Sequence, residues 1–167
     1  MKGAGRVVVL AAGLGTRMKS ARPKVLAPLC GRAMLGWVLD AAYSLAPDAL
    51  DVVIGKEGEA VRAAAELETA GAAQRRAAPR FVVQEPRNGT GHALQVCLPE
   101  VGRGDGPVVV LYGDMPLLRA ESLARLCAAW RAQADAGQPG IALLTAEVAD
   151  PRGLGRVIRG ADGAVRD

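Results

Sequence analysis

Aromatic side chains are scarce in this 167-residue sequence, where they account for 3% of the residues. Proteins that stack the bases of a nucleic acid on their surface depend on such rings. The 21 lysines and arginines outnumber the 17 aspartates and glutamates, but they are scattered along the chain. We therefore expect a small anionic substrate to account for the basic balance, and no nucleic-acid partner. DNA binding that weakens steeply with salt would contradict this expectation.

Cysteine and histidine are also rare. Cys30, Cys97 and Cys127 are widely spaced and odd in number, which fits neither a disulfide framework nor a zinc site. His92 is the only histidine, and no serine or cysteine stands in an arrangement with it that indicates nucleophilic catalysis. We expect three reduced thiols, and a structural role for His92 at the start of a helix.

Long apolar runs are absent as well. No run approaches the roughly 20 residues that span a bilayer. The first apolar segment, "VVVLAAG", is too short for a signal peptide and leads directly into glycine and charged residues. The sequence therefore predicts a cytoplasmic protein without a membrane partner.

Short apolar runs alternate with helix-like segments throughout the chain. The strands are expected at Val7–Leu10, Asp51–Gly55, Phe81–Gln84, Pro107–Asp114 and Gly140–Val148. The helices are expected at Ala33–Leu45, Glu57–Ala73, His92–Leu98 and Glu121–Ala134. This alternation predicts an α/β fold, a Rossmann-like and mainly parallel sheet with helices on both faces. Ligands of such sheets bind beyond the carboxyl ends of the strands.

The end of the sequence resembles an interrupted hairpin. Gly155–Arg159 and Ala164–Asp167 flank the turn sequence "GADG", and the second arm is too short to complete a ladder. We expect the sequence to be part of a longer chain.

The loop "AAGLGTRMKS" follows the first predicted strand. Met18 occupies the place of a glycine in both the dinucleotide-binding fingerprint and the P-loop, so neither motif is present. Gly13 and Gly15 nevertheless let the backbone approach a ligand and direct N–H groups at anionic oxygens. Arg17 and Lys24 add cations that suit phosphate. The loop predicts a phosphate site; the alternative is a tight turn with solvated cations.

Two further polar loops follow predicted strands. Asp114, in "YGDMPLL", is suited to hold Mg²⁺ together with phosphates and water; the alternative is a helix N-cap. In "VQEPRNGTGHA", the Gln84 amide can read the edge of a base, and Gly89 lets the chain pass close to a flat ring. Thr90 suits either a base contact or a helix cap. All three loops should meet at one edge of the sheet.

Together these loops resemble a known family. "LAAGLGTRMKSARPKVL" is similar to the signature of sugar-phosphate nucleotidylyltransferases. "VVQEPRNGTGHAL" and "LYGDMPLL" are similar to the uridylyltransferase half of the bacterial bifunctional N-acetylglucosamine-1-phosphate uridylyltransferase and glucosamine-1-phosphate acetyltransferase. The resemblance implies a nucleotide-diphospho-sugar transferase fold. It also implies transfer of UMP from UTP to N-acetylglucosamine 1-phosphate, a step in peptidoglycan and lipopolysaccharide precursor synthesis.

The resemblance also implies roles for individual residues. Those around the uracil and ribose would be Leu10, Ala11, Ala12, Gly13, Gln84, Gly89 and Thr90, with Tyr112 and Gly113 beside the nucleotide. The catalytic cations at the triphosphate would be Arg17 and Lys24. Asp114 would hold Mg²⁺, and Gly155 would approach the sugar.

The sequence departs from the family at several points. Leu14 stands where the family usually has lysine, and Arg87 and Asn88 also differ. The family's sugar-binding glutamate, the asparagine that completes its metal site and its trimerising β-helix domain have no counterpart in residues 1–167. We therefore expect a partial nucleotidyltransferase domain with little activity by itself, and a trimer only where the β-helix domain is present.

Two other functions remain open from the sequence. One is a nucleotidyltransferase acting on another sugar phosphate, or on a cofactor precursor with CTP or GTP. The other is a nucleotide-binding module without activity. Base preference distinguishes the first from a uridylyltransferase, and pyrophosphate release distinguishes the second.

Overall fold

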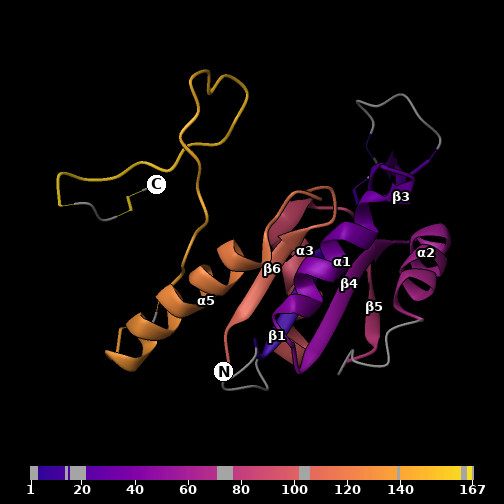
Figure 1. The fold of residues 1–167 in the computed structure, drawn as a ribbon, viewed down its shortest axis with the longest axis horizontal. Helices are drawn as coiled ribbons and strands as arrows, with labels where there is room; N and C mark the ends of the chain where they lie inside the picture. Colours follow the sequence, from indigo (N-terminus) through magenta and orange to yellow (C-terminus); the bar gives the residue numbers. More distant parts are fainter. Residues whose placement is uncertain are drawn as a thin grey trace.

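A four-stranded parallel sheet forms the centre of the computed structural model, which describes residues 4–13, 15, 22–70, 77–101, 106–138, 140–162 and 165–166. Its strands are β1 (Arg6–Leu10), β4 (Ala49–Gly55), β5 (Pro79–Gln84) and β6 (Val108–Tyr112), in the order β5-β4-β1-β6 (Figure 1). All three neighbouring pairs are parallel. The prediction of a mainly parallel sheet is therefore confirmed.

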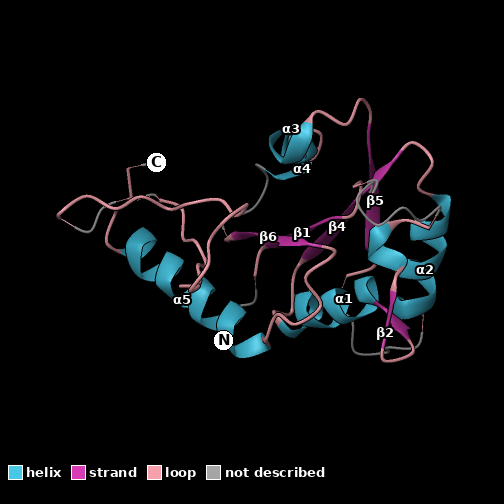
Figure 2. Cartoon of the chain, turned by 90° about the horizontal axis from the view of Figure 1, so that it is seen from above, coloured by secondary structure: helices cyan, strands magenta, loops and turns pink. Residues whose placement is uncertain are grey.

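Helices cover both faces of the sheet. Figure 2 shows α1 (Met34–Ser44), α2 (Glu59–Thr69) and α5 (Ala120–Asp135) on one face, and α3 (Gly89–Gln95) and α4 (Leu98–Val101) on the other. Most of the core lies on the first face, where side chains such as Val9, Leu39 and Leu50 are almost fully buried. A smaller cluster of Val8, Val53, Ala93 and Cys97 lies on the α3 face. None of the described helices is long and apolar enough to cross a membrane.

A buried ion-pair network joins three strands on the α3 face. Asp51, in β4, is fully buried and accepts hydrogen bonds from Arg6 Nη1 at 2.8 Å and from Arg80 Nε at 2.8 Å. Arg80 Nη2 also donates to it, at 3.0 Å. A buried carboxylate is costly unless it is paired, so this network favours the alignment of β1, β4 and β5 that brings both arginines to Asp51.

Several predicted boundaries differ from the structure. Helix α3 begins at Gly89, three residues before His92, because the poor helix propensity of the two glycines concealed its first turn. Strand β6 ends at Tyr112, and Gly113 and Asp114 form a turn. The sequence did not indicate the 3₁₀ turn η2 (Lys24–Leu26) or the short hairpin β2 (Pro28–Leu29) and β3 (Arg32–Ala33), since two-residue strands are too short to show alternation.

The strand predicted at Gly140–Val148 is wrong. The described residues of this segment form neither helix nor strand, and Ile141 is 84% exposed. An apolar run becomes a strand only when it pairs with an edge, and no local pattern encodes that pairing. Of the hairpin predicted at Gly155–Arg159 and Ala164–Asp167, the described residues form only one antiparallel bridge, between Arg159 and Val165. Figure 1 shows the chain after Gly140 outside the sheet, and residues 140–144 line a second cavity together with β6 without pairing with it.

Candidate functional site

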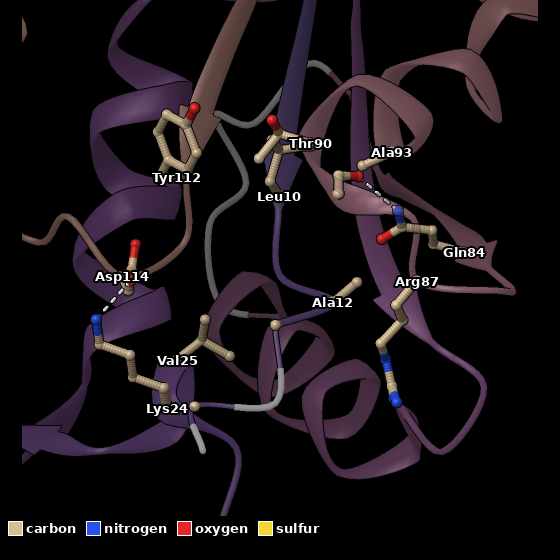
Figure 3. Close-up of a pocket in the computed structure, with 13 residues that line it drawn as sticks. Leu10, Ala12, Lys24, Val25, Gln84, Arg87, Thr90, Ala93, Tyr112 and Asp114 are labelled. Atoms are coloured by element: carbon tan, nitrogen blue, oxygen red, sulfur yellow. Dashed lines mark hydrogen bonds and ion pairs between the residues drawn. The ribbon is translucent and has the colours of Figure 1, made fainter. Parts of the chain in front are cut away.

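A cavity of about 490 Å³ opens at the carboxyl ends of β1, β5 and β6. The three polar loops meet here, as expected from the sheet. The residues that line it are Leu10, Ala12, Gly13, Gly15, Lys24, Val25, Gln84, Arg87, Gly89, Thr90, Ala93, Tyr112 and Asp114 (Figure 3).

An ion pair forms one wall of the cavity. Lys24 Nζ, in η2, donates to Asp114 Oδ2, in the turn after β6, at 2.7 Å. We call these two residues the charged wall. Gly15 has a φ of +62°, and its backbone packs so closely that a methyl group there would lie 2.7 Å from Lys24 Cβ. Gly15 therefore packs directly against Lys24, with no room for a side chain between them.

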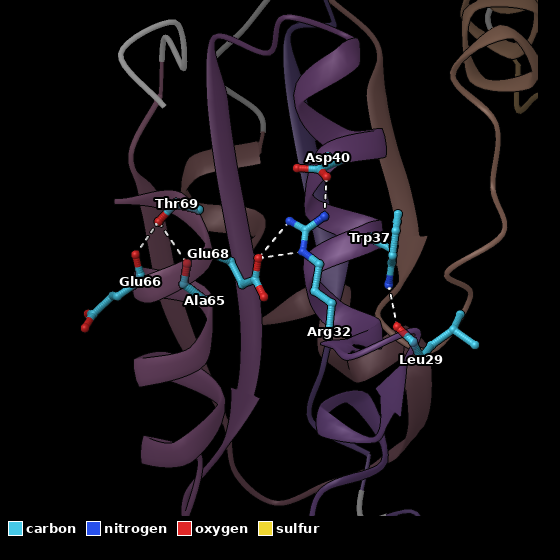
Figure 4. A network of polar contacts seen from close by, with 8 residues as sticks. All are labelled: Leu29, Arg32, Trp37, Asp40, Ala65, Glu66, Glu68 and Thr69. Carbon is cyan, nitrogen blue, oxygen red and sulfur yellow. Dashed lines mark hydrogen bonds and ion pairs between the residues drawn. The ribbon is translucent and has the colours of Figure 1, made fainter. Parts of the chain in front are cut away.

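Arg32 holds the hairpin that follows the lysine. Its guanidinium donates to Glu68 on α2 and to Asp40 on α1, with Nε–Oε2 and Nη1–Oδ2 distances of 2.7 and 2.5 Å (Figure 4). It also lies 5.2 Å from the centre of the Trp37 ring, whose indole N–H donates to the Leu29 carbonyl. The two carboxylates raise the pKa of Arg32 further above its usual range. These contacts tie the hairpin to two helices.

Gln84 and Arg87 form the opposite wall, which we call the amide wall (Figure 3). Gln84 is only 4% exposed, and its Nε2 donates to the Gly89 carbonyl at 2.8 Å. Because a carbonyl requires a donor, this bond fixes which way the amide faces. Figure 3 shows its oxygen pointing toward the cavity. Nε2 also lies 3.4 Å from His92 Nδ1, which places the histidine next to the amide.

Small and apolar residues bring the charged and amide walls together. The Gly113 N–H donates to the Leu10 carbonyl at 2.9 Å, and a methyl group at Gly113 would lie 3.0 Å from that oxygen. Gly113 and Ala11 are buried just behind the cavity, while Ala12 and Tyr112 line it. The close approach of the β6 turn to β1 therefore sets the width of the site.

Of the remaining predicted residues, the described Gly155 does not line the cavity. Arg17 and Leu14 lie outside the described residues. Gly155 lies in the exposed segment after α5, and nothing would come within 4 Å of a methyl group there. The roles assigned to Arg17 and Gly155 stay predictions.

Sequence reasoning missed three residues that line the cavity. Val25 and Ala93 belong to the core pattern of their elements and carried no separate signal. Arg87 stands in the same polar loop as Gln84, and a cation at that place was a usable signal.

Asp114 suits a metal ion whose other ligands come from a bound substrate and water. Among the described residues, no group of three acidic, histidine or cysteine side chains could enclose an ion. One carboxylate oxygen of Asp114, Oδ2, accepts a hydrogen bond from Lys24, and the Asp114 side chain is about one-third exposed. Mg²⁺ often takes one or two carboxylates and completes its octahedron with phosphates and water. The donor set therefore fits such an ion.

The fold is similar to that of several solved structures. The crystal structure of Rv0371c from Mycobacterium tuberculosis matches with a TM-score of 0.60 and 30% sequence identity. The match covers 79% of this chain and 62% of the Rv0371c chain. The same protein was also solved in complex with manganese (31% identity, TM-score 0.57, 76% of this chain and 59% of its own). UDP-glucose pyrophosphorylase in complex with UDP-glucose shares the fold, with a TM-score of 0.61 and 17% identity over 77% of this chain and 53% of its own.

Closer sequence relatives carry the name bifunctional protein GlmU. The relative from Streptomyces avermitilis is 50% identical over 95% of this chain and 31% of its own length, and that from Paraburkholderia xenovorans 48% over 95% and 32%. The chain thus spans about a third of the length of these relatives. Residues 7–148 also match the sequence family described as the MobA-like NTP transferase domain. With this match over most of its length, the chain belongs to the MobA-like NTP transferase domain family.

Proposed function

We propose that this chain contributes the nucleotide site of a uridylyltransferase, which transfers UMP from UTP to N-acetylglucosamine 1-phosphate and releases pyrophosphate. The observation that carries the proposal is the meeting of Gln84, the glycine loop and the Lys24–Asp114 pair in one cavity. About 50% identity to proteins named GlmU over 95% of the chain supports the same activity.

The two walls of the cavity suit the two ends of a nucleoside triphosphate. The buried amide of Gln84 and the apolar surface of Leu10 and Ala12 suit a flat base with hydrogen-bonding edges. Lys24, on the opposite wall, suits the phosphates. In this arrangement the base lies against the amide wall and the triphosphate extends toward the charged wall, with Gly13 and Gly15 offering backbone N–H groups between them.

The chemistry needs no general base. A phosphate oxygen of the sugar 1-phosphate is anionic near neutral pH and attacks the α-phosphorus in line while pyrophosphate leaves. Catalysis is then a matter of positioning and charge neutralisation. Lys24, and Arg17 by its place in the motif, stabilise the charge of the leaving pyrophosphate. The cavity has glycines and cations to do this, and Cys97 and Cys127 are buried outside its lining.

Asp114 would hold a divalent ion, which we propose to be Mg²⁺. The ion, when bound, supplies positive charge at the α-phosphate and the attacking oxygen. Asp114 would keep it beside the nucleotide, and Lys24 would transfer its contact from the carboxylate to phosphate. The manganese complex of Rv0371c supports a divalent ion in this fold.

The sugar side of the reaction rests on the resemblance alone. We propose that Gly155 approaches the sugar, and that the acetyltransferase activity and trimer implied by the resemblance belong to the whole protein. The cell-wall and lipopolysaccharide precursor role belongs to that same proposal.

Thermal denaturation with nucleotides tests the proposal. In the presence of Mg²⁺, we expect UTP to raise the melting temperature of this chain, and CTP and GTP to raise it far less. Stabilisation by CTP or GTP equal to that by UTP would instead favour the cofactor-precursor function. Pyrophosphate release from UTP and N-acetylglucosamine 1-phosphate then separates an active transferase from a module that only binds nucleotide.

A further inference from the structure

Lys24 stands on a very short element. The 3₁₀ turn η2 has three residues, and its backbone hydrogen bonds are local. The Leu26 N–H donates to the Pro23 carbonyl at 2.9 Å, and the Ala27 N–H donates to the Lys24 carbonyl at 3.0 Å. A single turn of this length gains too few bonds to hold its shape by itself. The position of Lys24 therefore depends on what holds the chain on either side of the turn.

The β2–β3 hairpin follows the turn and is joined to it directly. The Met34 N–H, at the start of α1, donates to the Ala27 carbonyl at 3.0 Å, and β2 pairs with β3, which carries Arg32. Val25 also attaches the turn to the core, because its side chain is buried. Apolar contacts are non-directional, however, so they do not fix the orientation of the turn. The hairpin is the directional support of Lys24.

Arg32 holds this hairpin to two helices (Figure 4). Its Nε and Nη2 both lie 2.7 Å from Glu68 Oε2, and its Nη1 lies 2.5 Å from Asp40 Oδ2. Arg32 and Glu68 are partly buried, so solvent screens their pair less than it screens an exposed ion pair. A guanidinium presents its donors in a rigid fork, which sets the orientation of the groups that it joins. We call Arg32, Glu68 and Asp40 the hairpin anchor.

Gly36 leaves room for the hairpin anchor. This buried glycine lies in the first turn of α1, and a methyl group built on it would lie 2.6 Å from Arg32 Nε and 2.7 Å from Glu68 Cδ. Glycine is less favourable than alanine inside a helix. The Arg32–Glu68 pair therefore occupies space that α1 leaves open only because a glycine stands at this position.

The hairpin anchor lies outside the cavity lining, so it can act on a ligand only through the segment that it holds. Resting on the function proposed above, we propose that Arg32 is a positioning residue, which fixes the hairpin and thereby the turn that presents Lys24 to the phosphates of UTP. Gly15 packs against Lys24 Cβ on the other side. The ammonium can then leave Asp114 for a phosphate while the backbone stays in place, which lowers the cost of binding.

Hydrogen exchange of the turn, measured by NMR, tests the inference without a ligand. The N–H groups of Leu26 and Ala27 close the turn, so their exchange rates report its opening. In Arg32→Met we expect both rates to rise about tenfold, because the hairpin loses its bonds to both helices and the turn opens more often.

Arg62→Met is the matched control. Arg62 lies on α2, pairs with Glu59 at 3.6 Å, lies 4.6 Å from the centre of the Phe81 ring and is outside the cavity lining. Its replacement also removes an arginine that contacts a carboxylate and a ring, but one that does not hold the hairpin. Both exchange rates should stay within about twofold of those in the unmodified chain.

Calorimetric titration in the presence of Mg²⁺ shows whether the position of the turn matters for phosphate. Arg32→Met should weaken pyrophosphate and UTP about fivefold each and leave uridine within about twofold, because uridine has no phosphate for Lys24 to contact. In a Lys24→Ala background, the same substitution should change none of these affinities, since the group that it positions is gone. An arginine with only a structural role would lower the melting temperature without this dependence on Lys24.

Gly36→Ala separates positioning from stability. The added methyl group displaces the Arg32–Glu68 pair while every charge stays in the chain, and alanine favours the helix. We expect faster exchange of the Ala27 N–H and weaker pyrophosphate binding, as in Arg32→Met. Arg32→Lys, which reaches one carboxylate but lacks the fork, should lie between Arg32→Met and the unmodified chain.

The outcomes separate this inference from the proposed function. If CTP binds the unmodified chain as tightly as UTP, the proposed function is wrong, whereas the exchange rates of the ligand-free chain still decide whether Arg32 holds the turn. Unchanged exchange in both Arg32→Met and Gly36→Ala would overturn the inference. A loss of UTP affinity in Arg32→Met that is equally large in the Lys24→Ala background would overturn it as well, and so would faster exchange with unchanged pyrophosphate affinity.

Discussion

The two walls of the cavity hold their polar groups in different ways. On the amide wall, Gln84 is 4% exposed and its amide is fixed by a backbone carbonyl. On the charged wall, the side chains of Lys24 and Asp114 are 40% and 33% exposed and satisfy each other. The amide wall is therefore organised before a ligand binds, whereas in the proposed function both charges on the other wall would exchange partners on binding phosphate and metal.

This difference assigns the two walls different energetic roles. A fixed, buried amide costs little to organise on binding and discriminates by shape and hydrogen-bond pattern. Partly exposed charges are screened by salt, and their ion pair contributes little to folding. They matter when the reaction redistributes charge on the phosphates, because electrostatic stabilisation acts where charge develops. We expect substitutions on the charged wall to affect turnover most, and substitutions on the amide wall to affect base affinity.

The largest expected effect comes from removing either charge. Asp114→Ala or Lys24→Ala should lower turnover by about 10²- to 10³-fold, since in the proposed function each group would contact the metal or the phosphates in the transition state. Pyrophosphate release from UTP and N-acetylglucosamine 1-phosphate measures the effect. The free energy of unfolding should change by only about 0.5 kcal/mol, as is usual for surface substitutions. Near-normal turnover in either variant would show that the charged wall is not the reaction centre.

The next largest expected effect is on the affinities for uridine and UTP, which should respond differently to substitutions on the two walls. Gln84→Leu should weaken uridine and UTP by the same factor, about tenfold, because both ligands lose the base contact. Lys24→Ala should weaken UTP and leave uridine unchanged. Titrations followed by NMR chemical shifts give both affinities. Gln95→Leu, an exposed glutamine of α3 outside the cavity lining, is the matched control. A larger loss for UTP than for uridine in Gln84→Leu would contradict the assignment of the amide wall to the base.

The sequence predicted the sheet and the edge at which the loops meet, but not the pairing inside the site. Continuous β-branched runs such as "VVVL" indicate buried parallel strands, and the glycine and proline of the loops mark where strands end. The partner of Asp114 is Lys24, 90 positions earlier in the chain, and a contact at that separation has no local signal. The sequence therefore predicts metal binding or helix capping for Asp114, and it does not predict the ion pair with Lys24.

The segment at residues 140–148 shows the same limit at the level of the fold. Its apolar pattern is as strand-like as that of β6, yet β6 pairs with β1 along its whole length and the segment pairs with nothing among the described residues. Strand propensity describes how well a segment fits a half-buried surface, and that surface has to be supplied by another part of the chain. Sequence predicts the candidate strand but not its docking.

A smaller effect is expected where the glycine loop meets the charged wall. Gly15→Ala forces a non-glycine residue into a φ of +62° and places its methyl group 2.7 Å from Lys24 Cβ, so the lysine must shift. We expect UTP affinity to fall severalfold and stability to fall by about 1 kcal/mol. Gly13→Ala is the control for folding, because Gly13 has no positive φ and open space around its Cβ position. Equal melting temperatures for both variants would show that the Gly15 conformation is not required.

The smallest effect uses a cysteine behind the amide wall as a reporter. Burial, with the nearby Asp51 carboxylate, raises the pKa of Cys97 to about 11, so only about one thiol in a thousand is ionised at pH 8. Burial also raises the pKa of Cys127, whereas Cys30 is exposed. Cys30 should therefore react first with a thiol-specific disulfide reagent, and the two buried thiols only through local opening.

The labelling rate of Cys97 then compares the two walls directly. Its Sγ contacts the carbonyl of Ala93, and Ala93 lines the cavity on the side of α3. UTP, which reaches the amide wall, should stabilise α3 and slow Cys97 labelling severalfold, because bound ligand lowers the population of the open form. Pyrophosphate, which we expect to bind at the charged wall only, should leave the rate unchanged. Cys30, at the exposed turn of the β2–β3 hairpin, provides the internal reference. Protection of Cys97 by pyrophosphate as strong as that by UTP would mean that the two walls respond to ligand as one unit.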